Sequence, residues 1–132
     1  MLFIKFIGKV TNNFPKKTYF CLINLYAMKI TIVSGARPNF MKIAPITRAI
    51  KAAQEAGKKI SYRLIYTGRQ DDTSLDASLF SDLDMKKPDG YLGVSGHGQS
   101  EVTAAIMLAF EKELNTHPAQ VVLVVDDLTA TM

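Results

Sequence analysis

The stretch that decides the fold is MKITIVSGARPNFMKIAPITRAI, residues 28–50. It begins with KITIV at Lys29–Val33, a β-branched run that predicts a short strand ended by Ser34-Gly35. Apolar residues then recur at helical spacing until Gly57, which predicts a helix. Pro45 inside this helix predicts a delayed start or a kink, because proline lacks a backbone donor. The stretch therefore encodes a strand, a tight turn and a helix.

The remainder of the chain continues this alternation of apolar runs and helical periodicity. The last run, Gln120–Val125, is apolar at every position after Gln120, which is typical of a central parallel strand covered on both faces. The order β-α-β-α-α-β predicts an α/β fold with a parallel, Rossmann-like sheet between helices. The expected elements are a strand at Ile60–Tyr66, a short helix from Thr73 to Leu83, a glycine-rich connection at Lys86–Gly98, a helix from Val102 to Leu114 and a strand at Gln120–Val125.

A sheet of so few strands is expected to leave one edge of the Val121–Val125 strand unpaired. Exposed backbone donors and acceptors on that edge predict aggregation of the isolated chain. We therefore expect residues 28–132 to be the amino-terminal part of a larger Rossmann-like domain.

Residues 1–27 differ in composition from the rest of the chain, since they are rich in aromatic residues and contain no acid. They show no sustained helical or strand periodicity, so we expect a poorly ordered appendage. One interpretation is a secretory signal with Ala27 at its cleavage position. The other is an upstream extension of a protein that begins at Met28. Asn24 and Tyr26 interrupt the apolar run and favour the extension.

Composition excludes several classes of protein. With 132 residues, 48% hydrophobic and 21% charged, the chain has ordinary globular composition. The net charge of +4 equals the four lysines of residues 1–27, so the neutral remainder argues against nucleic-acid binding. The uncharged stretch at residues 18–28 is too short for a transmembrane helix, which needs about 20 residues. A single cysteine, Cys21, predicts a reduced cytoplasmic chain without disulfides or structural zinc.

Ligands of open parallel sheets bind beyond the carboxyl ends of the strands. The first such end is the turn Ser34–Ala36, which leads into a helix with Arg37 and Lys42 nearby. Backbone N–H groups and a guanidinium favour an anion such as phosphate. An ordinary turn with two solvated cations fits the residues equally well. The turn has neither the dinucleotide fingerprint nor a Walker A loop.

Two other strand ends carry acids. Asp71 and Asp72 follow the second strand, and we expect Asp72 or Thr73 to cap the next helix. Asp126-Asp127 follow the most hydrophobic strand, where partly buried carboxylates need compensation. Adjacent residues of an extended chain point to opposite faces, so we expect one of the two in a functional cleft. For the other carboxylate, the alternative role is capping of a following helix. A phosphoacceptor aspartate is a weaker interpretation, because the sequence lacks the other acids of such a pocket.

Two histidines complete the candidates. His97 lies in the glycine-rich connection and is a candidate functional residue if that loop covers a substrate. An exposed loop histidine without a role is the commoner case. His117, beside Pro118, is expected to be structural.

Three segments together, residues 28–50, RLIYTGRQ at 63–70 and VVLVVDDLTAT at 121–131, resemble the amino-terminal part of the non-hydrolysing UDP-N-acetylglucosamine 2-epimerases. The resemblance implies a GT-B-type fold of two Rossmann-like domains with the active site between them. Such enzymes eliminate UDP to leave a glycal and add it back with inversion at carbon 2, without a redox cofactor. They act in cell-envelope polysaccharide biosynthesis.

The resemblance also implies roles for residues of this chain. Asp127 matches the catalytic carboxylate, and Arg37 and Lys42 match the diphosphate site, with Gly35 and Pro38 in the same motif. The implied partner is a UDP-sugar, and a homodimer is expected only of a full-length protein. No metal is implied.

Departures from the family pattern leave alternatives open. Asp126 stands where the family usually has glycine, and Arg69-Gln70 stand where it has Gln-His. The family's other catalytic residues and its UDP-binding domain would follow Met132, so we expect no turnover by this chain alone. The alternatives are a non-catalytic remnant or weak nucleotide-sugar-binding module, and a glycosyltransferase of the same architecture, which would lack the Gly-x-Arg-Pro motif.

Overall fold

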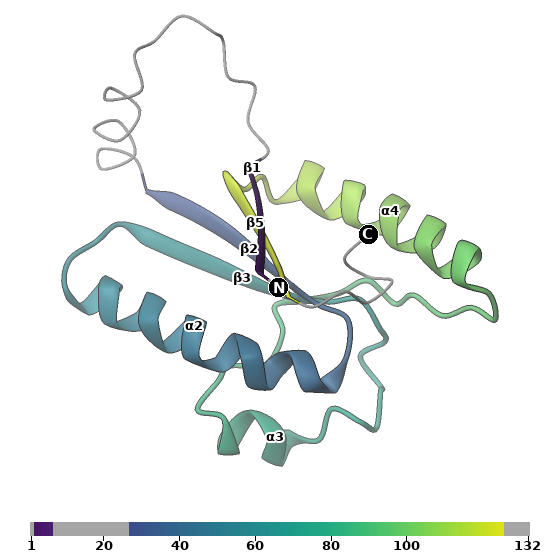
Figure 1. The fold of residues 1–132 in the computed structure, drawn as a ribbon, viewed down its shortest axis with the longest axis horizontal. Coiled ribbons are helices and arrows are strands. Elements are labelled where there is room, and N and C mark those ends of the chain that lie inside the picture. Colours follow the sequence, from purple (N-terminus) through teal and green to yellow (C-terminus); the bar gives the residue numbers. More distant parts are fainter. Residues whose placement is uncertain (1, 7–26, 126–132) are drawn as a thin grey trace, which may run out of the picture.

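The computed structural model describes residues 2–6 and 27–125. These residues form one five-stranded sheet in the order β1-β5-β2-β3-β4. Strands β5, β2, β3 and β4 are parallel, and β1 is antiparallel to β5 (Figure 1). The elements are β1 (Leu2–Phe6), β2 (Met28–Ser34), α2 (Arg37–Glu55), β3 (Ile60–Tyr66), α3 (Ala77–Asp82), β4 (Gly90–Tyr91), α4 (Gln99–Thr116) and β5 (Val121–Val125).

Helices cover both faces of the sheet, which confirms the predicted Rossmann-like α/β arrangement. Helices α2 and α3 lie against one face, while α4 lies across the other (Figure 1). Phe40 of α2 and Phe80 of α3 pack edge to face, with ring centroids 5.3 Å apart. Both rings join Ile32 of β2 and Leu64 of β3 in the main hydrophobic core.

The first strand, turn and helix form as expected, except at Pro45. Helix α2 begins at Arg37 and runs through Pro45 as one element, so proline does not delay the start of the helix. It ends before Gly57, whose positive φ of 81° is a conformation that favours glycine.

The region after β3 differs from the expectation. Helix α3 begins at Ala77, four residues after the predicted start at Thr73. The glycine-rich connection contains a short strand, β4, which pairs with the end of β3. Two residues are too few to give a periodic pattern, so sequence reasoning missed this strand.

The structure contradicts the expected free edge on the last strand. Strand β5 pairs in parallel with β2 on one side and antiparallel with β1 on the other. The predicted aggregation through an unpaired β5 edge therefore loses its basis, because Leu2–Phe6 cover that edge. These five residues of the expected appendage belong to the sheet.

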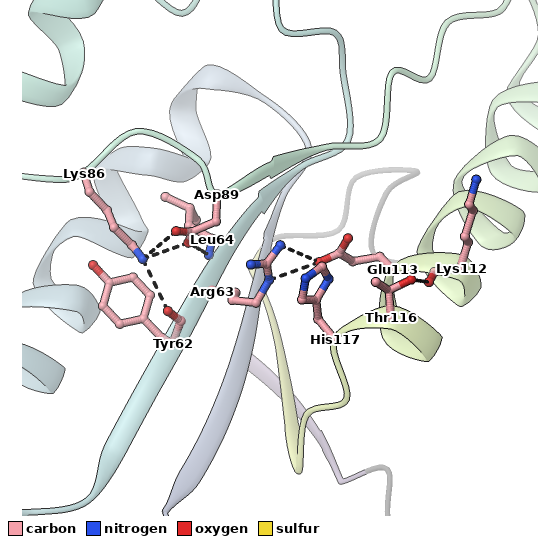
Figure 2. Close-up of polar contacts among 9 residues, drawn as sticks. All are labelled: Tyr62, Arg63, Leu64, Lys86, Asp89, Lys112, Glu113, Thr116 and His117. Carbon is pink, nitrogen blue, oxygen red and sulfur yellow. Dashed lines mark hydrogen bonds and ion pairs between the residues drawn. The ribbon is translucent and has the colours of Figure 1, made fainter.

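Polar contacts fasten α4 and the β4 region to β3 (Figure 2). One carboxylate oxygen of Glu113 in α4 accepts two hydrogen bonds from the Arg63 guanidinium, at 3.1 and 2.9 Å. The same oxygen lies 3.1 Å from Nδ1 of His117, which gives that histidine a structural contact.

A second set of contacts lies on the edge of β3 (Figure 2). Asp89 accepts the Leu64 N–H at 2.7 Å and pairs with Lys86 at 2.8 Å. The Lys86 ammonium lies 4.4 Å from the centre of the Tyr62 ring, a cation–π contact. Burial, followed by the charge of Asp89, raises the pKa of Tyr62.

Among the described residues, no helix is long and apolar enough to span a membrane.

Candidate functional site

A cavity of about 470 Å³ lies at the carboxyl ends of β2 and β3. This is the edge of a parallel sheet at which ligands of such folds bind. The wall combines the turn after β2, the segment after β3 and the first turns of α4. Its residues are Gly35, Tyr66, Thr67, Gly68, Arg69, Asp71, Asp72, Thr73, Val94, Val102 and Ile106.

The turn between β2 and α2 is held from inside by Asn39. Its carboxamide oxygen accepts the N–H of Gly35 at 3.0 Å and the N–H of Ala36 at 2.9 Å. Asn39 is fully buried, and its backbone N–H donates to the carbonyl of Ala36 at 3.0 Å. These three hydrogen bonds within the chain fix the turn before α2.

These contacts change the expected mode of anion binding. The N–H groups of Gly35 and Ala36 are already used by Asn39, and Pro38 has none. A ligand anion at this end of α2 would therefore depend chiefly on side-chain cations and on the helix dipole. The expectation of free backbone donors at both turn positions was wrong, because the local Asn39 acceptor takes them.

The site residues predicted from sequence lie along the start of α2. Gly35 lines the cavity, whereas Arg37 and Pro38 form the exposed first turn of the helix. Lys42 is exposed one turn later and does not line the cavity. Asp127 lies outside the described residues, so the proposed catalytic carboxylate has no position in this structure.

Sequence reasoning missed the most strongly perturbed group in the cavity wall, Tyr66. Its phenol donates a 2.6 Å hydrogen bond to Asp72, and the Tyr66 residue is only 5% exposed. Burial, followed by the hydrogen bond to Asp72, raises the pKa of Tyr66 to about 12. The hydrogen bond from Tyr66 in turn lowers the pKa of Asp72. A neutral phenol beside a charged carboxylate is therefore the stable state at neutral pH.

The acids after β3 do not cap α3 as predicted. Asp72 instead accepts the backbone N–H of Ser74 at 2.9 Å, which fixes a turn before the helix. Asp76 occupies the position before the first residue of α3. Asp71 pairs with Arg69 at 2.7 Å, and both side chains are mostly exposed. The hydrogen bond from Arg69 lowers the pKa of Asp71.

The glycine-rich loop contributes a wall residue but no histidine. Val94 lines the cavity, whereas His97 is exposed and does not line it. The backbone N–H of His97 donates to the Glu101 carboxylate at 3.3 Å, at the start of α4. Within residues 2–6 and 27–125, no group of three or more His, Cys, Asp or Glu residues is arranged to hold a metal ion.

Comparison with known proteins finds sugar-nucleotide epimerases, although no family model matches the chain. The chain is 29% identical over 105 residues to the UDP-2,3-diacetamido-2,3-dideoxy-D-glucuronate 2-epimerase of Pseudomonas aeruginosa. It is 27% identical over 105 residues to the UDP-N-acetylglucosamine 2-epimerase of Methanocaldococcus jannaschii. Both matches cover 80% of this chain, which spans only 28% and 27% of the two relatives.

Solved structures give the same result. The Methanocaldococcus jannaschii UDP-GlcNAc 2-epimerase in complex with UDP-GlcNAc and UDP matches with a TM-score of 0.66 and 27% identity. That match covers 78% of this chain and 27% of the other. The Neisseria meningitidis enzyme bound to UDP-GlcNAc, at 24% identity and a TM-score of 0.65, supports the fold alone. The resemblance to UDP-N-acetylglucosamine 2-epimerases inferred from the motifs is thereby confirmed.

Proposed function

We propose that this chain forms part of the UDP-sugar site of a 2-epimerase that interconverts UDP-N-acetylglucosamine and UDP-N-acetylmannosamine. One observation carries the proposal. The epimerase-like motif forms the turn between β2 and α2, which lies at the carboxyl edge of the sheet beside the cavity. The similarity to epimerases, one of them solved with UDP-GlcNAc and UDP, supports the assignment of the ligand class.

Arg37 and Lys42 are the proposed ligands of the diphosphate. Both are exposed cations within the first two turns of α2, whose dipole adds positive potential at its amino terminus. The guanidinium of Arg37 offers paired donors to phosphate oxygens, which lysine cannot. Gly35 and Pro38 are the proposed turn residues of the site. Gly35 lines the cavity, and Pro38 fixes the first turn of α2.

Asp127 is the proposed catalytic carboxylate. Strand β5 ends at Val125 beside the end of β2, so Asp127 follows in sequence from the strand end next to the Gly35 turn. In the proposed reaction a base removes the proton on carbon 2. The carbon 1–oxygen bond then breaks with its electron pair on UDP and leaves a glycal. Return of UDP to carbon 1, with a proton added to the opposite face of carbon 2, gives the epimer.

Turnover is proposed only for a longer polypeptide, because the chain spans little more than a quarter of its relatives. A homodimer, if the relatives form one, is likewise proposed only for that longer protein. A nucleotide-sugar-binding module without turnover is the second candidate. The charged Asp126 and the exposed Gln70, both departures from the family pattern, favour it.

A fusion experiment separates the two candidates. The carboxyl-terminal remainder of the Methanocaldococcus jannaschii enzyme is joined after Met132, and epimerisation of UDP-GlcNAc is followed by NMR. We expect turnover that Asp127→Asn and Arg37→Ala reduce at least 100-fold and 10-fold, and that the exposed-cation control Lys51→Ala leaves unchanged. A folded fusion that binds UDP-GlcNAc without turnover supports the binding module. Full activity in Asp127→Asn refutes the catalytic assignment.

A further inference from the structure

The charged residues in the wall of the cavity are unevenly balanced. Among the described residues that line the cavity, Arg69 is the one cation, and Asp71 and Asp72 are the acids. Arg37 and Lys42, the proposed diphosphate ligands, lie at the start of α2 and do not line the cavity. An anionic group that enters the cavity therefore meets the guanidinium of Arg69.

The two acids of the wall are held in different ways. Both oxygens of Asp72 accept hydrogen bonds, one from the Tyr66 phenol at 2.6 Å and the other from the Ser74 N–H at 2.9 Å. These contacts give Asp72 a structural role in the wall. Asp71 instead pairs with Arg69, whose Nε and Nη2 donate to its two carboxylate oxygens at 2.8 and 2.7 Å. A guanidinium binds other oxyanions with two adjacent acceptor oxygens in the same geometry.

The contact between Arg69 and Asp71 is easily exchanged. Both residues lie in the segment between β3 and α3, and their side chains are 62% and 68% exposed. Exposed ion pairs contribute little to stability, because water screens the charges and holding two side chains in place costs entropy. A ligand oxyanion can therefore replace Asp71 at the guanidinium, while the contacts of Asp72 keep the wall in place.

We propose that Arg69 binds an oxyanion of the sugar nucleotide, and that Asp71 weakens this binding by competing for the guanidinium. The inference rests on the proposed function, since it takes the ligand to be a UDP-sugar. The oxyanion is the diphosphate or a carboxylate on the sugar, because a guanidinium forms paired hydrogen bonds with both. Arg69 thereby adds a ligand to the site on the wall of the cavity opposite in sequence to the α2 motif, and Asp71 sets its strength.

The test is a double-mutant cycle of the parent chain, Arg69→Gln, Asp71→Asn and the variant that carries both substitutions. Asp82→Asn is the matched control, because it removes one exposed acid that does not line the cavity. Dissociation constants for UDP-GlcNAc and UDP-glucuronate are measured by amide NMR at fixed ionic strength. The amide signals of residues away from the cavity show whether each variant is folded as the parent is.

We expect Arg69→Gln to weaken the binding of UDP-glucuronate about 10-fold, and Asp71→Asn to strengthen it about 2- to 5-fold. Asp82→Asn should bind as the parent does. An equal loss for UDP-GlcNAc in Arg69→Gln identifies the diphosphate as the oxyanion, whereas a loss for UDP-glucuronate alone identifies the sugar carboxylate. In the Arg69→Gln background, most of the gain from Asp71→Asn should disappear, because no guanidinium is then released.

Three results would overturn the inference. Equal gains from Asp71→Asn in both backgrounds would show general charge repulsion in place of competition for Arg69. Binding of both sugar nucleotides that Arg69→Gln leaves unchanged would remove Arg69 from the site, although the proposed function would stand. Failure of the folded parent chain to bind either sugar nucleotide would contradict the proposed function, and the inference with it.

Discussion

Replacement of Asn39 by alanine tests how the turn before α2 is built. The carboxamide oxygen of Asn39 accepts the N–H groups of Gly35 and Ala36 at 3.0 and 2.9 Å, and the residue is fully buried. A buried donor that loses its partner costs about 1–3 kcal/mol. Because Gly35 and Ala36 are half-buried and water reaches them in part, the lower end applies to each. The two donors together give a loss of roughly 2–3 kcal/mol in the free energy of unfolding.

Urea unfolding followed by far-UV circular dichroism measures this loss. With a slope of about 1–3 kcal/mol per molar urea, the midpoint should fall by roughly 0.7–3 M. Asn39→Asp is the matched variant, since its carboxylate accepts the same two N–H groups near the positive end of α2. We expect it to retain more than half of the stability that alanine loses. An Asn39→Ala midpoint within error of the parent, or an aspartate variant as damaged as the alanine one, would refute the proposed role of the side-chain oxygen.

Two further predictions concern the cavity wall. The Tyr66 phenol should titrate near pH 12, measured by NMR of tyrosine labelled at Cζ, and Asp72→Asn should lower this pKa while burial keeps it above 10. Because the folded pKa lies above the unfolded value of 10, the stabilisation is complete below pH 10 and is lost as the pH rises toward 12; a phenol that titrates at 10 contradicts the contact. Gly68→Ala should cost about 1–3 kcal/mol, since a Cβ there would lie 2.5 Å from Cε1 of Tyr66. Gly98→Ala, with no atom within 4 Å, should change the urea midpoint little, and equal effects of the two variants would refute the packing argument.

The main elements were predictable from local periodicity. Strand β5 and strand β3 end where their apolar runs end, and Gly57 ends α2 because its positive φ suits glycine. Pro45 was a misleading signal for a delayed start, since a missing donor weakens a helix without determining where that helix begins. The two-residue β4 depends on pairing with β3, which no local pattern encodes.

Contacts between distant parts of the chain explain the other differences. The edge of β5 was expected to be open because Leu2–Phe6 show no strand periodicity of their own, and only the pairing with β5 makes them a strand. Likewise, Tyr66 has the sequence context of an ordinary strand residue. Burial raises its pKa first, and the hydrogen bond to Asp72, which the chain turns back to place at 2.6 Å, raises it further. The cavity lies at strand ends, which is where the sequence places the candidate ligand sites, while the partners of its polar groups were not predictable.

Titration of the labelled chain with UDP-GlcNAc, followed by amide NMR, tests the proposed ligand site most directly. We predict saturable shifts at Gly35, Thr67 and Gly68, the backbone of the cavity wall, and their loss in Arg37→Ala. Lys51→Ala, which alters an exposed cation further along α2, should bind as the parent does. The absence of saturable shifts, or shifts confined to residues away from this edge of the sheet, would contradict the assignment of the UDP-sugar site.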